Sequence, residues 1–136
     1  MKSAEERNAG HMAKLVPEVA ELAKRHIEAC SAEGIELVIV QSVRTMEEQA
    51  AIYARGRTAS GKAVTAAKPG MSWHNYGRAY DVAVIEGGRI DWKSPKYARA
   101  GELGKSLGLV WGGDFKSVRG DLGHFEFHPG MRLKKV

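Results

Sequence analysis

The sequence has only one cysteine, no run of the roughly 20 apolar residues needed to span a bilayer, and no apolar signal segment at its N-terminus. The lone Cys30 cannot form an internal disulfide, and its position on the apolar side of an expected helix predicts a small buried thiol. We therefore expect no disulfide framework and no stable membrane insertion.

The sequence also lacks the features of a nucleic-acid binder. Its formal net charge is +5, but the basic residues are scattered and form only a short cluster at Arg132, Lys134 and Lys135. A nucleic-acid interface predicts a basic stripe with interleaved aromatic residues, and no such stripe or motif is present. We expect no nucleic-acid partner, although the charge favours some other anionic surface.

The composition is that of an ordinary globular domain. Apolar residues make up 43% of the chain and charged residues 27%, and a chain of 136 residues can bury a sizeable core without metal or disulfide support. We therefore predict one domain over residues 1–136, with a polar terminus at 1–13 and a basic terminus at 129–136. We expect a monomer.

Periodicity and turn signals predict alternating helices and strands. The helices are expected over 15–33, from Thr45 to Arg55 and over 95–107, and the strands over 37–40, 79–85, 89–92, 109–111 and 123–128. The Gly87-Gly88 pair predicts a hairpin turn, and residues 57–73 and 112–120 predict loops. This pattern favours an α+β domain with a small antiparallel sheet flanked by helices.

Residues that could bind zinc occur in two places, at 72–81 and at 121–128. Catalytic zinc uses three protein ligands from His, Asp, Glu and Cys, and no helical His-Glu-x-x-His motif is present. Fully extended, the chain from His74 to Asp81 would span about 23 Å, so it must turn if both bind one ion. Residues 75–77 supply that turn.

The second segment alternates, with Phe125 and Phe127 on one face and the polar side chains on the other. Along a strand His124 and His128 lie about 13 Å apart, so they cannot share an ion. Glu126 lies about 7 Å from His124 on the same face, where it either orients a ligand or is a surface carboxylate.

The pattern S-x-H-x-x-G-x-A-x-D at 72–81, followed by Asp121 and the His-Phe-Glu of 124–126, resembles a family of zinc peptidases. These are the D-alanyl-D-alanine carboxypeptidases and L-alanyl-D-glutamate endopeptidases, in particular phage endolysins and bacterial wall endopeptidases. Segments 42–45, 48–49, 54–58 and 111–114 agree with it, and the resemblance covers residues 14–128. It implies a DD-peptidase or hedgehog-like fold.

The resemblance also implies roles for individual residues. His74, Asp81 and His124 match the metal ligands, Asp121 matches the catalytic carboxylate, and Arg44 matches an arginine that binds the substrate and the oxyanion. Ser42 and Ser72 are expected beside the substrate. Zinc lowers the pKa of water, so that Asp121 can take its proton and later pass it to the leaving amine.

Each role has a simpler alternative. Asp121 could be only a turn residue, Arg44 could pair with Glu47 or Glu48, and Ser72 could merely cap the loop. Asp114 is a rival carboxylate that turn chemistry also explains.

Three functions remain open at this point. The first is hydrolysis of peptidoglycan stem peptides at the bond between L-Ala and D-Glu, by a phage endolysin made in the host cytoplasm without a signal peptide and acting on the wall after release. The second is removal of terminal D-Ala by a carboxypeptidase or dipeptidase. The third is a zinc-stabilised module that binds wall without cutting it.

Overall fold

The computed structural model describes residues 2–62, 65, 67–115 and 121–133. Within these ranges no helix combines the length and apolarity needed to cross a membrane. The described elements are α1 (Ala4–Met12), α2 (Pro17–Ala32), β1 (Glu36–Gln41), α3 (Met46–Ala54), the 3-10 turn η1 (Trp73–Tyr76), β2 (Ala79–Glu86), β3 (Arg89–Asp91), α4 (Tyr97–Ser106), β4 (Val110–Trp111), the 3-10 turn η2 (Gly112–Asp114) and β5 (His124–Glu126).

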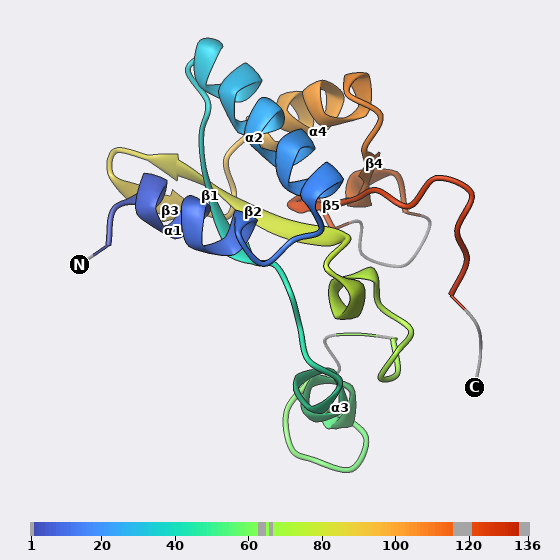
Figure 1. Cartoon of the computed structure of the whole chain (residues 1–136). Coiled ribbons are helices and arrows are strands. Elements are labelled where there is room, and N and C mark those ends of the chain that lie inside the picture. Colours follow the sequence, from blue (N-terminus) through green and yellow to red (C-terminus); the bar gives the residue numbers. More distant parts are fainter. Residues whose placement is uncertain (1, 63–64, 66, 116–120, 134–136) are drawn as a thin grey trace.

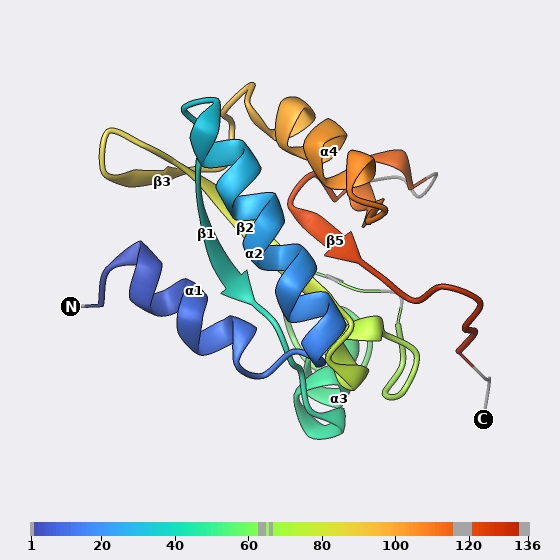
Figure 2. The same cartoon turned by 45° about the horizontal axis from the view of Figure 1, so that its top comes forward.

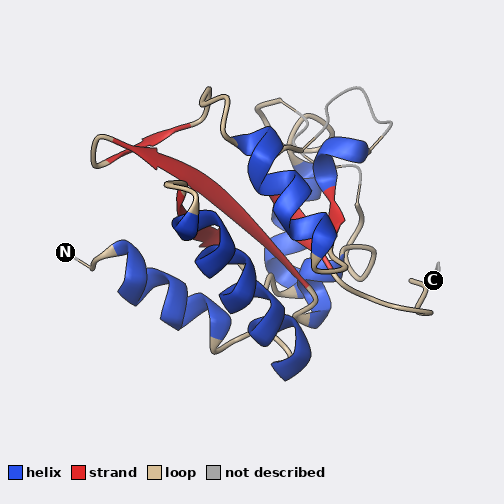
Figure 3. Cartoon of the chain, turned by 90° about the horizontal axis from the view of Figure 1, so that it is seen from above, coloured by secondary structure: helices blue, strands red, loops and turns tan. Residues whose placement is uncertain are grey.

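The strands form one antiparallel sheet in the order β1-β2-β5-β4, with β3 paired to the far end of β2. Helices α2 and α4 lie side by side against one face of this sheet, whereas α3 lies beyond the end of β1 (Figure 1). The turn between β2 and β3 lies at one end of the sheet, apart from the helices (Figure 3). The predicted α+β class and small antiparallel sheet are confirmed.

Local signals located most elements to within a few residues. Helix α2 ends just before Gly34, which adopts a positive φ of 78°. Helix α3 begins with the capping box that Thr45 and Glu48 predict, in which each side chain accepts a hydrogen bond from the other residue's backbone N–H. The hairpin turn falls at Gly87 and Gly88 as expected.

The N-terminal segment differs from the prediction of a polar terminus, because residues 4–12 form helix α1 beside the edge strand β1 (Figure 2). The side-chain amide of buried Asn8 donates to the Leu37 carbonyl at 3.0 Å, and its oxygen accepts from the Ile39 N–H at 2.6 Å. One side chain thus pairs with the edge strand as a peptide group would. Of the predicted basic terminus, Lys134 and Lys135 lie outside the described residues.

The core lies between the sheet and helices α2 and α4, and it contains one fully buried histidine, His26. The His26 ring must donate from Nε2 to the Ala100 carbonyl (2.8 Å), so its Nδ1 accepts from the Tyr80 hydroxyl (2.8 Å). Burial lowers the pKa of His26, against the opposing effect of the hydrogen bond to Ala100. A neutral histidine therefore ties α2 to both β2 and α4.

This network predicts a loss of stability in acid. Below the ordinary pKa of 6.5 the unfolded chain takes up a proton that folded His26 does not, so the free energy of unfolding falls as the pH drops. Glutamine offers a donor and an acceptor without titrating, so His26→Gln should show a shallower fall between pH 7 and pH 5. Urea unfolding across this range measures the difference; parallel curves for the two proteins would contradict the assignment.

Candidate metal centre and active-site cleft

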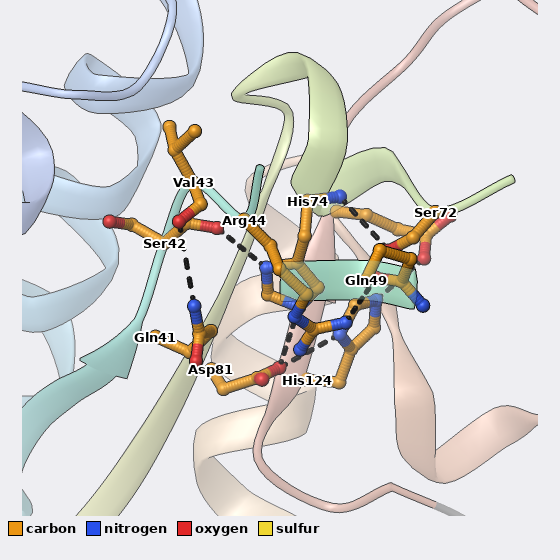
Figure 4. Close-up of polar contacts among 10 residues, drawn as sticks. Gln41, Ser42, Val43, Arg44, Gln49, Ser72, His74, Asp81 and His124 are labelled. Atoms are coloured by element: carbon orange, nitrogen blue, oxygen red, sulfur yellow. Dashed lines mark hydrogen bonds and ion pairs between the residues drawn. The ribbon is translucent and has the colours of Figure 1, made fainter. Parts of the chain in front are cut away.

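His74 approaches the sheet from the turn η1, which follows the long loop. Gly77 ends this turn at a positive φ of 69°, a conformation that glycine adopts without strain, and the chain then enters β2. The His74 side chain is 3% exposed, and its Nδ1 lies 2.7 Å from the Ser42 carbonyl oxygen. Because a carbonyl only accepts, Nδ1 donates to the Ser42 oxygen, and Nε2 is turned toward Asp81 (Figure 4).

Asp81 and His124 face each other because the register of β2 and β5 pairs these two residues directly. His124 Nδ1 lies 2.8 Å from Asp81 Oδ1, and the same oxygen lies 3.2 Å from His74 Nε2. The other nitrogen of His124, Nε2, donates to Glu126 Oε1 at 2.6 Å. Each imidazole is thus held from behind by an acceptor, with its second nitrogen turned toward Asp81.

These three residues fit a metal ion. One ligand atom from each of His74, Asp81 and His124 lies within 4.8 Å of the other two. Burial acts to raise the pKa of Asp81, but the hydrogen bonds from His124 and His74 outweigh it and hold that pKa well below its ordinary value. Burial acts to lower the pKa of His124, but Asp81 and Glu126 raise it to about 10. Two imidazole nitrogens and one carboxylate oxygen are donors that suit a divalent cation.

Glu126 is not the surface carboxylate of the simpler alternative, since it is buried and contacts two histidines. Burial acts to raise its pKa, but the hydrogen bonds and charges of His124 and His128 lower it. His128 bonds to the second carboxylate oxygen and stacks on Trp73, with ring centroids 4.1 Å apart. His128 thus supports Glu126 and is not one of the three candidate metal ligands, as the strand spacing predicts.

The three candidate ligands line a cleft of about 610 Å³, which we call the metal cleft. Asp121 and Arg44 both line it, as does Ser72. Burial of the Asp121 carboxyl, with the nearby negative charge of Asp81, raises its pKa above the ordinary value. The sequence had suggested Asp114 as a rival, but Asp114 pairs with Lys105 at 2.7 Å and is not among the residues that line the cleft.

Arg44 is positioned by neighbours from two segments, η1 and α3. Its backbone N–H donates to the His74 carbonyl at 2.9 Å, and its guanidinium donates to Gln49 Oε1 at 2.7 Å. Asn75 donates to the Arg44 carbonyl at 2.9 Å. Among the described residues Arg44 forms no ion pair with Glu47 or Glu48, and its buried Nε has no protein partner. The guanidinium is thus oriented within the cleft wall.

Ser42 and Ser72 both hold His74 in place through hydrogen bonds. The Ser72 hydroxyl accepts from the His74 N–H at 3.2 Å, as the capping alternative predicts. The Ser42 carbonyl orients His74, and its hydroxyl lies 2.7 Å from Nδ1 of His11 on α1. The contribution of His11 was missed because 31 residues separate it from Ser42 and no local motif marks the contact.

A family model gives the decisive comparison. Residues 12–104 match the VanY model, described as D-alanyl-D-alanine carboxypeptidase. The chain belongs to the VanY family. The matched region contains His74, Asp81 and Arg44, and it ends before Asp121 and His124.

Curated relatives of this VanY-family chain include two peptidases. The chain is 37% identical over 111 residues to the peptidoglycan L-alanyl-D-glutamate endopeptidase CwlK of Bacillus subtilis (strain 168), a match that covers 74% of the chain and 66% of the relative. It is 30% identical over 125 residues to the L-alanyl-D-glutamate peptidase of Listeria phage A118, covering 90% of the chain and 41% of the relative. The chain thus spans less than two thirds of the length of either relative.

Solved structures confirm the fold. The L-Ala D-Glu endopeptidase ChiX of Serratia marcescens superposes with a TM-score of 0.68 at 19% identity, covering 90% of this chain and 86% of that one. A vancomycin-resistance D,D-pentapeptidase VanY, solved in complex with Zn(II), gives a TM-score of 0.60 at 17% identity, covering 83% and 72%. The expected DD-peptidase architecture is therefore confirmed.

The contact between Glu126 and His124 predicts a loss of metal affinity when it is removed. Glu126→Ala leaves His124 Nε2 without its acceptor, and loss of such a contact weakens metal binding by about 10- to 100-fold. Competition with a zinc chelator measures the change. Glu102→Ala, at an exposed position on α4, is the matched control and should bind zinc like the unaltered protein; equal affinities for both variants would contradict the role of Glu126.

Proposed function

We propose that this chain is a zinc-dependent peptidase that hydrolyses the bond between L-Ala and D-Glu in peptidoglycan stem peptides. The observation that carries the proposal is the convergence of His74, Asp81 and His124 at the floor of a cleft that Asp121 and Arg44 also line. A carboxylate and a cation beside a three-ligand centre make up the apparatus of hydrolysis at a metal.

His74 through Nε2, Asp81 through Oδ1 and His124 through Nδ1 would hold the zinc. When bound, zinc supplies a Lewis acid that acidifies water and polarises an amide carbonyl. The Ser42 carbonyl and the Glu126 carboxylate keep the two imidazoles in the tautomers that this binding requires. His-Asp-His donors with an open side suit catalytic zinc better than a closed structural site.

Asp121 and Arg44 would handle the proton and the developing negative charge. Asp121 takes a proton from the attacking water and returns it to the leaving amine, and its raised pKa suits a group that both accepts and donates. Arg44 offers a fixed positive charge to the amide oxygen as that oxygen becomes negative. A module that only binds the wall would not need such a preorganised charge.

The names of the relatives support the endopeptidase over the carboxypeptidase. CwlK and the phage peptidase both carry the L-alanyl-D-glutamate specificity in their names, whereas the family model carries that of a D-alanyl-D-alanine carboxypeptidase. The phage relative supports the wider proposal of an endolysin that acts on the wall after release. Clearing of permeabilised host cells by the purified protein would test the endolysin proposal directly.

Mass spectrometry of purified peptidoglycan fragments, incubated with zinc-loaded protein, tests the reaction. We expect fragments with a new N-terminal D-Glu, and we expect none after treatment with a chelator. Release of free D-Ala would instead establish the carboxypeptidase. An intact substrate in the presence of stoichiometric zinc would favour the binding module.

Asp121→Asn should keep stoichiometric zinc but lose hydrolysis by about 10²- to 10⁴-fold, because the amide cannot shuttle the proton. The matched control is Asp114→Asn, which removes a carboxylate paired with Lys105 and should retain activity. Steady-state rates and zinc content are measured on the same samples. Full activity in Asp121→Asn would move the base elsewhere, with Glu126 as the next candidate in the cleft.

A further inference from the structure

A second hollow adjoins the candidate metal centre. It has a volume of about 350 Å³ and shares Asp81 and Asp121 with the metal cleft. Its remaining wall includes Val40, Trp92 and Leu122. We call it the Trp92 pocket. Asp81 and Asp121 thus line both hollows, and a substrate that fills both would pass these two residues.

The two hollows differ in charge. The metal cleft is lined by two arginines, Arg44 and Arg55, and neither forms an ion pair with a carboxylate among the described residues. The described lining of the Trp92 pocket contains no lysine or arginine. Apart from the shared carboxylates its wall is largely apolar, so it suits an uncharged group.

Trp92 presents a large apolar surface at this pocket. Its side chain is 63% exposed, and the neighbouring Leu122 is 47% exposed. The chain before Trp92 is fixed, because the Tyr97 hydroxyl accepts from the Val84 N–H and donates to the Asp91 carbonyl, both at 3.0 Å. An exposed indole next to this anchored backbone offers a flat face on which a ligand ring can stack.

The substrate of the proposed function also differs in charge between its two sides, as the two hollows do. On the acyl side of the scissile bond lies L-Ala, whose nitrogen is acylated by the lactyl group of an uncharged N-acetylmuramyl sugar. On the amine side lies D-Glu, whose free α-carboxylate is one carbon from the scissile nitrogen. The substrate is therefore neutral on one side of the bond and anionic on the other.

We propose that the Trp92 pocket binds the acyl side of the substrate, with the muramyl sugar stacked on Trp92, while Arg55 in the metal cleft binds the α-carboxylate of D-Glu. This inference rests on the proposed function and adds the direction of the bound substrate. Charge complementarity and the continuity of both hollows with Asp81 and Asp121 support this direction.

The first test compares two substrates that differ only in the sugar. One is the disaccharide-linked tripeptide, and the other is the N-acetylated tripeptide, so that the L-Ala nitrogen is acylated in both. We expect Trp92→Ala to lower kcat/KM for the sugar-linked substrate by about tenfold and to leave the N-acetyl peptide unchanged. Ile90→Ala, on the same hairpin and outside the pocket lining, is the control and should change neither rate.

The second test compares substrates with a free α-carboxylate or an α-amide at D-Glu. The unaltered protein should prefer the carboxylate, and Arg55→Gln should remove most of that preference without changing the rate on the amide. Arg89→Gln, at an exposed position on β3, controls for the loss of one positive charge and should keep the preference.

The outcomes separate this inference from the proposed function. Cleavage at the expected bond, with Trp92→Ala slowing both acyl substrates equally or neither of them, would overturn the sugar site. A preference for the carboxylate that survives Arg55→Gln would overturn the assigned direction. Failure of the unaltered protein to cleave any of the four substrates would instead overturn the proposed function.

Discussion

The candidate centre depends on the pairing of β2 with β5, which places Asp81 directly opposite His124. A slip of one residue would turn every side chain of β5 to the other face and separate the pair. Two contacts hold the register: Phe125 is fully buried in the core, and the Val82 N–H donates to the Gly123 carbonyl at 2.8 Å. A Cβ at Gly123 would lie 2.4 Å from the Val82 carbonyl oxygen, so this close approach requires glycine.

The third proposed ligand, His74, is carried by a turn and owes its position to a backbone carbonyl of the segment that follows β1. The register of β1 shifts between Ile39 and Gln41, and the chain then brings the Ser42 carbonyl to His74 Nδ1. Helix α1 supports the same segment twice, through Asn8 on the backbone of β1 and through His11 on the Ser42 hydroxyl. An N-terminal helix that touches none of the proposed ligands thus contributes to their geometry.

Sequence reasoning predicted what local patterns encode. The alternation at 123–128 located β5 and its polar face, and the ten-residue motif located His74 and Asp81 on a turn and the following strand. Helix α1 was missed because its contribution is a buried polar side chain, Asn8, that satisfies an edge strand nearly thirty residues away. The place of Trp92 was likewise unreadable, since its neighbours in the pocket come from β1, β2 and the segment before β5.

The sheet carries two of the proposed metal ligands, whereas loops carry the residues proposed to bind the substrate. This arrangement suggests how specificity can vary around one kind of metal centre. Asp81 and His124 lie on paired strands backed by the core, so they tolerate little change. The two residues that we propose bind the substrate lie instead just after an element ends: Arg55 follows α3, and Trp92 follows β3. Such positions can change without disturbing the strand register. A hollow left open on the acyl side admits a long substrate, whereas filling the amine side would favour a short terminal group. These loops, rather than the metal centre, would therefore decide between endopeptidase and carboxypeptidase activity.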